Sequence, residues 1–381
     1  MRFIHTSDWH LGRSLCGERL IEDHRHVLGQ LVQVAKDFRA EAMLVAGDLY
    51  DRAVPAPDAV QLLDEVVSEL VLGCGVNVFV IAGNHDSATR LGFGAKIMAQ
   101  NRLHMAGSLR EGPHVVRLLD AAGEIACCTV PYAEPVIAAE ELACPSICDH
   151  DTAMRAAVER IRAAVPSGRS VLMAHGFVPG AEESESERAL TVGGAGTVGA
   201  DAFDGFDYVA LGHLHRAQEI GDGRIRYSGS ILKYAFSEEK HAKSVELVEM
   251  DAAGRCRVER ALLIPRREVR TLSGRFDELL RNPSGNRGDL LAVTLLDATP
   301  ILDAKLRLSE IYPNVLQVQQ PNFLRPGAGP LESPDYGGMQ DSDLFAAFFA
   351  QVNGREMTPE EAAELKTALD AFRMTQREAL V

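Results

Sequence analysis

Five short apolar runs, each closed by polar residues, constrain the fold of this chain more than any other feature. They are rich in Val, Ile, Leu and Phe and too short to be helices, so we read them as buried strands. The runs cover residues 3–5, 43–46, 76–82, 171–174 and 208–211. Apolar residues recur at helical spacing between them, over 20–38 and 60–71. This alternation predicts an α/β fold over roughly the first 250 residues.

Length and composition exclude several classes of protein. A chain of 381 residues suits about two domains, and 46% apolar with 24% charged residues excludes collagen, coiled coil and wholesale disorder. No apolar run approaches the roughly 18 residues of a membrane helix, and the start turns polar too soon for a signal peptide. Seven scattered cysteines favour a reducing compartment, so we expect a cytoplasmic protein.

The charge is acidic overall but uneven. The net charge of −15 argues against a general nucleic-acid coat. Residues 255–287 nevertheless hold nine arginines against four acidic residues, while 331–381 hold ten acidic residues against four basic ones. The arginines either bind backbone phosphates or form an ordinary charged surface.

Beyond residue 225 the pattern changes. Residues 226–264 read as consecutive strands with a hairpin, which predicts a second, mainly antiparallel sheet portion. A helix at 276–280, a strand at 289–297, a helix at 302–311 and a strand at 314–319 then predict a small α+β unit.

A Pro/Gly-rich linker and a helical tail complete the chain. The linker covers 326–334, and an apolar stripe over 344–352 predicts the first tail helix. The second begins at Thr358, which forms a capping box with Glu361. We therefore predict domains at 1–268, 269–325 and 326–381.

The chemistry lies where the predicted strands end. Ligands of α/β proteins bind at the carboxyl ends of strands, and each run is followed there by His, Asp or Asn, mostly beside glycine. These residues are Asp8, His10, Asp48, Asn84, His85, Asp86, His175, His213 and His215. A single such histidine is more often structural, but five coinciding ends are hard to explain that way.

The ligand types indicate a metal site. Imidazole and carboxylate without thiolate suit Mn²⁺, Fe²⁺, Zn²⁺ or Mg²⁺. Leaving out His85, seven ligands are too many for one catalytic ion and suit two ions that share a carboxylate. Such a pair is typical of phosphate ester hydrolysis.

The motifs Asp-x-His, Gly-Asp, Gly-Asn-His-Asp, His-Gly and Gly-His-x-His occur in an order that resembles the calcineurin-like metallophosphoesterase superfamily. The resemblance implies two packed β-sheets flanked by helices, with a dinuclear metal centre. More narrowly, "HTSDWHLGR", "GDLYDRAVP" and "FDYVALGHLH" are similar to the SbcD family of bacterial nuclease subunits. This narrower likeness runs from residue 1 to about 320 and makes 269–325 a capping, DNA-recognition domain.

The resemblance also implies roles for the strand-end residues. Two divalent ions, most often Mn²⁺ with Mg²⁺ as the alternative, would be bound there. One would be held by Asp8, His10, Asp48 and His215, and the other by Asp48, Asn84, His175 and His213. His85 would act at the scissile phosphate. Asp86 would orient its ring or merely cap a turn.

The family resemblance implies a nuclease subunit active in DNA recombination, replication and repair. It implies 3′–5′ exonuclease action on double-stranded ends and endonuclease action on single strands and hairpins. The partners would be DNA and an SbcC-type coiled-coil ATPase that contacts the tail, around a homodimer of this chain. The alternatives are a small-substrate metallophosphodiesterase and a DNA-binding scaffold subunit with a vestigial metal site.

Further residues allow two readings each. Arg52 is a DNA-phosphate contact or a surface charge, and Tyr227 and Lys233 are substrate contacts or strand packing. We read the acidic, Ser-rich segment 182–187 as solvated, because it would repel phosphate.

Overall fold

The five apolar runs are strands, and they lie in two six-stranded sheets. β1 (Arg2–Thr6), β4 (Ala42–Val45) and β5 (Asn77–Ile81) belong to the first sheet, whereas β9 (Arg169–His175) and β10 (Tyr208–Gly212) belong to the second. Neighbouring strands among these five are parallel within each sheet. The computed structural model describes residues 1–110, 112, 114–165, 167–187, 196–321, 345–346, 349–350 and 355–365.

Antiparallel strands lie at one edge of the first sheet and at both edges of the second. The first has the order β14-β13-β1-β4-β5-β6, with β6 (Leu103–Ala106), β13 (Ser244–Met250) and β14 (Cys256–Leu262). The second has the order β11-β12-β10-β9-β8-β7, with β7 (His114–Asp120), β8 (Gly123–Val130), β11 (Gln218–Ile220) and β12 (Ile225–Tyr227). A separate two-stranded ribbon joins β2 (Ser14–Leu15) to β3 (Glu18–Arg19).

Alternate side chains of the strands build three apolar layers. Successive residues of a strand face opposite sides. Phe3, Leu44 and Met173 therefore pack between the two sheets. Their neighbours Ile4 and Met43 pack outward against the helices of the first sheet. The arrangement is a helix–sheet–sheet–helix sandwich, which confirms the predicted fold class.

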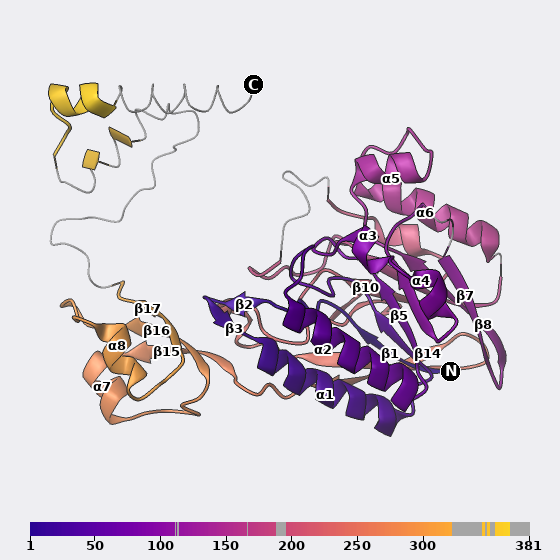
Figure 1. Ribbon diagram of the computed structural model, residues 1–381, viewed down its shortest axis with the longest axis horizontal. Coiled ribbons are helices and arrows are strands. Elements are labelled where there is room, and N and C mark those ends of the chain that lie inside the picture. The colour runs from indigo at the N-terminus through magenta and orange to yellow at the C-terminus, as the bar shows by residue number, and fades with distance from the viewer. Residues whose placement is uncertain are drawn as a thin grey trace. The chain divides into compact units, whose positions relative to one another are not determined.

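The main helices cover the outer faces of the sheets. α1 (Ile21–Phe38) and α2 (Pro57–Ser68), which continues into the π-helical turn η1 (Glu69–Gly73), lie side by side over the first sheet (Figure 1). α6 (His150–Ala164) covers the second sheet and starts at an Asp149 capping box. Shorter elements are α3 (Ala88–Leu91), α4 (Ala95–Ala99), α5 (Pro135–Glu141), η2 (Ala200–Phe203) and η3 (Phe236–Glu238).

The strands and the antiparallel hairpin predicted over 226–264 are present, but they do not form a sheet portion of their own. β12 joins the second sheet parallel to β10, while the β13–β14 hairpin extends the first sheet antiparallel to β1. The hairpin itself was expected, but its partner lies more than 240 residues away in sequence at Arg2 and Phe3. Local spacing carries no information about that pairing.

The small unit after the sandwich has the predicted helices and strands, together with a strand over 269–274 that was not predicted. β15 (Val269–Gly274), α7 (Phe276–Arg281), β16 (Leu290–Leu295), α8 (Ala304–Ser309) and β17 (Val315–Gln319) follow one another. The three strands are parallel in the order β15-β16-β17 and enclose their own apolar core. We call residues 265–321 the small module.

The tail forms a second compact unit. Contacts divide the chain into Met1–Phe323 and Leu324–Val381, and the domain boundaries at 268 and 325 stay a prediction. Residues 359–365 are helical, and the capping box is present: Thr358 N–H donates to Glu361, whose N–H donates to Thr358 Oγ1. Most of the stripe at 344–352 lies outside the described residues. Within the described ranges, no helix combines the length and apolarity that crossing a membrane requires.

A buried ion pair joins the two sheets. Glu246 on β13 is fully buried and accepts a hydrogen bond from Arg260 Nε at 2.9 Å. Its other oxygen lies 3.5 Å from Arg226 Nη1 on β12 of the second sheet. Burial raises the pKa of Glu246, so the two guanidinium groups are needed to hold its charge.

We predict that Glu246→Ala destabilises the fold by about 3 kcal/mol, because it leaves Arg226 facing the interior without this carboxylate. The measurement is the free energy of unfolding in urea. Glu259→Ala is the matched control, since Glu259 on β14 pairs with Arg257 at the surface and should cost less than about 1 kcal/mol. Equal losses in the two variants would contradict the importance of this pair.

Candidate metal centre

The strand ends of both sheets meet at one edge of the sandwich. Asp8, just after β1, donates its N–H to Gly47 O at 3.0 Å. Its carboxylate accepts the N–H of His213 from the second sheet, at 3.0 and 3.1 Å. His175 Nδ1 donates to Ala46 O at 2.9 Å, because a carbonyl can only accept. Each sheet therefore holds the loops of the other in place.

Two glycines permit this close approach. A Cβ on Gly212 would lie 1.8 Å from Ala46 O, and a Cβ on Gly83 would lie 2.2 Å from Asp48 Oδ1. No side chain fits at either position, so the glycines beside the polar residues are required by the meeting of the loops.

Four candidate ligands have strained backbones. Asp8, His10 and Asp48 have φ values of 52°, 45° and 51°, and His213 has 109°. Non-glycine residues at positive φ are uncommon, and each costs on the order of 1–3 kcal/mol unless the surroundings enforce it. Such strain is typical of sites where side-chain placement matters more than local stability.

One cluster contains Asp8, His10 and His215, whose ligand atoms lie within 4.8 Å of one another. The Nε2 atoms of His10 and His215 are 3.1 Å apart. Nitrogens bound about 2.1 Å from a common ion stand roughly 3.0–3.4 Å apart. The pair therefore fits a divalent ion.

A second cluster contains Asp8, Asp48 and His175. Asn84 Oδ1 lies 2.9 Å from His175 Nε2 and 3.3 Å from His213 Nδ1. Asp48 Oδ2 lies between the clusters, 3.7 Å from His10 Nε2 and 3.6 Å from His175 Nε2. The structure thus brings all seven predicted ligands together, with Asp48 near histidines of both clusters.

Burial sets the charge state of the site. It lowers the pKa of His10 and His213 well below the ordinary value and that of His215 to about 4, so these rings are neutral at pH 7. Burial and the neighbouring Asp48 raise the pKa of Asp8 well above its ordinary value. The imidazoles are therefore neutral, and the Asp8 carboxyl beside them resists ionisation. A bound cation would compensate for both.

His85 lies at the rim of the site and is half-buried. Its Nδ1 donates to Asp51 O at 2.8 Å and its N–H donates to Asp48 Oδ1 at 2.9 Å. Its ring packs edge-on against His10, with centroids 4.7 Å apart. The Asp51 carbonyl thus fixes the ring and leaves Nε2 available.

The prediction that Asp86 orients His85 is corrected. The Asp86 carboxylate accepts the N–H groups of Gly83, Leu49 and Tyr50 at 2.9–3.0 Å. It therefore ties the loop after β5 to the loop after β4. Asp86 is a positioning residue, and the turn-capping alternative describes it better than a catalytic role.

The structure also corrects two of the three DNA-contact candidates. Tyr227 is fully buried, and its hydroxyl accepts Val178 N–H and donates to Gly176 O. Lys233 donates to Glu239 O and to Glu268. Neither side chain is free to meet DNA. Arg52 is 85% exposed and remains a candidate.

Sequence reasoning missed the residues behind His215. Ser186 Oγ lies 2.5 Å from His215 Nδ1 and also hydrogen-bonds Glu238, while Glu187 accepts His215 N–H at 2.6 Å. Segment 182–187 is therefore not simply solvated: Ser186 and Glu187 turn inward. No motif marks these residues, because their partners come from distant parts of the chain.

We predict that Mn²⁺ stabilises the protein more at pH 7.5 than at pH 5.5. Burial raises the pKa of Asp86 to about 7 from 3.8. Without metal, the stability that the protonated Asp86 carboxyl contributes is complete below about pH 4. It is lost as the pH rises through about 7. Ionised carboxylates attract the cation, so Mn²⁺ at about a hundred times its Kd should restore about 2.7 kcal/mol at the higher pH.

The measurement is the melting temperature with Mn²⁺ or with EDTA at both pH values. Asp8→Asn is the control and should reduce the Mn²⁺-dependent shift at pH 7.5. A shift that is equal at both pH values, or larger at pH 5.5, would contradict a carboxylate-dependent metal site.

Two family models match different parts of the chain. A family model described as calcineurin-like phosphoesterase matches residues 1–217. A second model, of the SbcD C-terminal type and described as the type 5 capsule protein repressor C-terminal domain, matches residues 265–353.

Several solved structures are similar in fold. TT1561 of Thermus thermophilus is 12% identical, covers 69% of this chain and 99% of its own, and has a TM-score of 0.41. A dimetal phosphatase from Danio rerio is 13% identical, covers 70% of this chain and 99% of its own, and has a TM-score of 0.40. GAP50, the anchor in the inner membrane complex of Plasmodium, is 13% identical, covers 87% of this chain and 99% of its own, and has a TM-score of 0.41. At these TM-scores the three structures say nothing about what this chain does.

The first match spans more than half of the chain, and the residues it covers build most of the candidate metal centre. The domain model and the donor set together support a metal-dependent phosphoester hydrolase. The chain belongs to the calcineurin-like metallophosphoesterase superfamily and carries an SbcD-type C-terminal domain.

Proposed function

We propose that this chain is the DNA nuclease subunit of an SbcCD-like complex that acts in recombination, replication and repair. It would be a 3′–5′ exonuclease on double-stranded DNA and an endonuclease on single strands and hairpins. The observation that carries the proposal is the convergence of seven metal-ligand side chains and His85 in a chain with an SbcD-type C-terminal domain. A small-substrate enzyme has no evident need for that domain.

The metal ligands divide into two groups around Asp48. Asp8, His10, Asp48 and His215 would hold one divalent ion. Asp48, Asn84, His175 and His213 would hold the other. Ions in such an oxygen and nitrogen set act as Lewis acids on a phosphoester and on its water nucleophile. The donor set suits Mn²⁺, with Mg²⁺ as the alternative.

His85 would supply a proton to the leaving oxygen. Its Nδ1–H is fixed on the Asp51 carbonyl, so Nε2 is the nitrogen that can carry the transferred proton. An imidazole fits this role, because the ordinary histidine pKa lies near neutral pH. The hydrogen bond from His85 N–H to Asp48 keeps this group beside the ligands without making it one.

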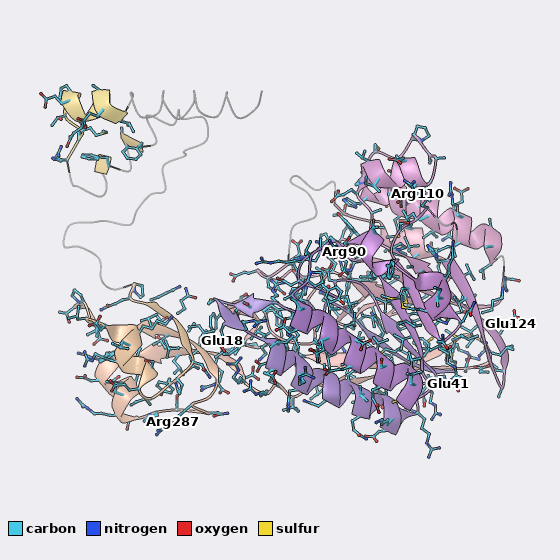
Figure 2. All side chains as sticks on the ribbon, in the orientation of Figure 1. Glu18, Glu41, Arg90, Arg110, Glu124 and Arg287 are labelled. Carbon is cyan, nitrogen blue, oxygen red and sulfur yellow. The ribbon has the colours of Figure 1, made fainter. Side chains whose placement is uncertain are left out.

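Few of the arginines over 255–287 are free to bind DNA. Seven of the nine pair with acidic side chains, as Arg270 does with Asp289 at 2.6 Å. Arg275 and Arg287 have no acidic partner among the described residues, and Arg287 lies on the small module (Figure 2). DNA phosphates would therefore meet these two arginines rather than the whole stretch. They would also meet Arg52, whose Nε lies 3.8 Å from Asp51 Oδ2 but whose side chain is 85% exposed.

The complex would contain a homodimer of this chain with two SbcC-type ATPase subunits in the cytoplasm. The acidic tail with its apolar positions would bind the coiled-coil partner. A second copy would cover the apolar surface around Phe93, between α3 and α4, and Ile97 on α4, which are 82% and 72% exposed. Large apolar side chains at this exposure, close in sequence, are typical of a protein contact.

We predict that His85→Gln lowers Mn²⁺-dependent DNA cleavage about 10²–10⁴-fold, because general acid catalysis contributes that much. Mn²⁺ affinity should stay unchanged, since His85 is not a proposed ligand. The assay uses end-labelled duplex and hairpin DNA with Mn²⁺, Mg²⁺ or EDTA. His26→Gln, on the exposed face of α1, is the matched control and should cleave normally.

Two results would overturn the nuclease proposal. Cleavage of a small phosphodiester but not of DNA, with the ATPase partner added, would favour the small-substrate enzyme. DNA binding without any cleavage, with Mn²⁺ confirmed bound, would favour a scaffold subunit with a vestigial site.

We predict that Phe93→Glu combined with Ile97→Glu converts the dimer to a monomer, because it places charge in an apolar contact. The measurement is the molar mass by light scattering during gel filtration. Val136→Glu on α5 is the control, since Val136 is equally exposed on another helix. A wild-type chain that is already monomeric, or a double variant that stays dimeric, would exclude this surface.

A further inference from the structure

His215 is held on three sides by residues outside the ligand set. Glu187 accepts its backbone N–H at 2.6 Å, and Lys243 Nζ donates to its carbonyl at 2.7 Å. Its ring nitrogen Nδ1 faces Ser186 Oγ at 2.5 Å. His215 is thus fixed in both its backbone and its ring, while Nε2 points at His10.

The hydrogen-bond chain behind the ring has one consistent direction. The Glu238 carboxylate can only accept, so the Ser186 hydroxyl donates to it. Ser186 Oγ must then accept from His215 Nδ1–H. This fixes the tautomer that leaves a lone pair on Nε2, the atom that would bind metal.

Lys243 keeps Glu238 ionised inside the protein. Its Nζ donates to the second Glu238 oxygen at 2.5 Å and to Ser230 Oγ at 2.8 Å. Both charged side chains are buried. Lys243 and Ser186 lower the cost of burying this carboxylate, which remains a strong acceptor for the Ser186 hydroxyl.

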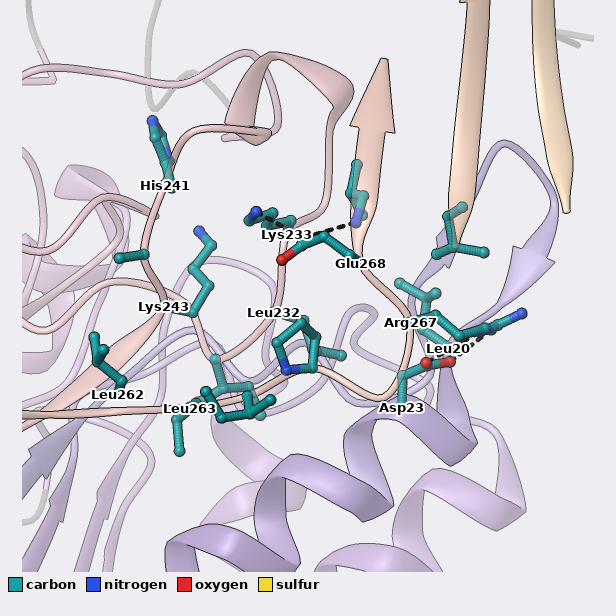
Figure 3. A pocket seen from close by; sticks show the side chains of 16 residues that line it. Leu20, Asp23, Leu232, Lys233, His241, Lys243, Leu262, Leu263, Arg267 and Glu268 are labelled. Carbon is teal, nitrogen blue, oxygen red and sulfur yellow. Dashed lines mark hydrogen bonds and ion pairs between the residues drawn. The ribbon is translucent and has the colours of Figure 1, made fainter. Parts of the chain in front are cut away.

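The residue after Glu238 faces the small module instead. Glu239 accepts Thr271 N–H at 3.1 Å and the Thr271 hydroxyl at 2.5 Å, at β15. Its own carbonyl accepts Lys233, which also donates to Glu268 at 2.6 Å (Figure 3). Adjacent carboxylates of one short turn therefore contact the metal ligand and the small module.

Apolar residues of the sandwich and the small module form one core at this joint but leave part of it open. A cavity of about 180 Å³ lies between the sandwich and the small module, lined by residues that include Lys233, Lys243, Leu263, Glu268 and Leu290 (Figure 3). Phe236 of η3 packs against the apolar core, and the polar contacts of Glu238 and Glu239 add to this packing.

We propose that the turn η3 connects the small module to the metal ligand His215. In this arrangement Ser186 and Glu238 are positioning residues for His215, and the Glu239–Thr271 contact sets how well they hold it. The inference rests on the proposed two-ion site and adds a structural control of one ion by the small module.

The test is Mn²⁺ titration of the EDTA-treated full-length protein, with free Mn²⁺ followed by electron paramagnetic resonance. The wild type should bind two ions. Ser186→Ala should weaken one of them about 10–100-fold, the usual effect of losing a group that orients a metal-binding histidine. Ser186→Thr keeps the hydroxyl and should restore the affinity.

The link between η3 and the small module is tested at Glu239, which directly follows η3, and at its partner Thr271. Glu239→Ala removes both hydrogen bonds to Thr271 and should weaken the same ion by about three- to tenfold. Thr271→Val removes only the hydroxyl bond and should weaken it less. The double variant should be no weaker than Glu239→Ala. Thr294→Val, on the neighbouring strand β16, is the matched control and should leave both affinities unchanged.

Unchanged affinities in Glu239→Ala and Thr271→Val would overturn the coupling, and unchanged affinities in Ser186→Ala would overturn the positioning role. If Ser186→Ala melts early and loses both ions, the Mn²⁺ affinities of Ser186→Thr and Thr271→Val test the inference in its place. A wild type that binds no Mn²⁺ would overturn this inference together with the two-ion site. Two bound ions without DNA cleavage would overturn only the proposed substrate.

Discussion

The contact between the strand ends of the two sheets is the constraint on which the rest of the structure depends. The Ala46 carbonyl meets Gly212 and the ring of His175, and the Asp8 carboxylate accepts His213 N–H. Buried polar groups must find partners, and here each sheet supplies them to the other. Separated sheets would split the candidate ligands into two incomplete sets. The strained backbones at Asp8 and His213 persist because this contact enforces them.

Charge buried at this joint explains much of what surrounds it. Burial and their mutual repulsion oppose ionisation of Asp8 beside Asp48, so a bound cation would relieve a cost that the fold already carries. Behind His215 the charge of a second buried carboxylate is compensated within the protein, since Glu238 is paired with Lys243. The two arrangements lie side by side, so residues outside the proposed ligand set contact His215 directly.

Much of the sandwich and the candidate ligand set could be predicted because the signals are local. A short apolar run that ends in Gly-Asp or Gly-Asn-His predicts both a strand and the polar side chains at its carboxyl end. The roles of Asp86, Tyr227 and Lys233 could not be predicted, because each depends on partners from another segment. Segment 182–187 was read as solvated for the same reason, since acidic composition does not reveal that Ser186 faces a buried histidine.

The sequence by itself determined the candidate ligands and that they close five strands, since residue type and spacing along the chain suffice for both. Only the tertiary structure decided that Asp48 lies between two clusters, that the β13–β14 hairpin completes the first sheet, and that Glu238 and Glu239 face different parts of the molecule. The physical reason is that strand pairing, burial and hydrogen-bond partners are set by residues far apart in the chain, which no local pattern records.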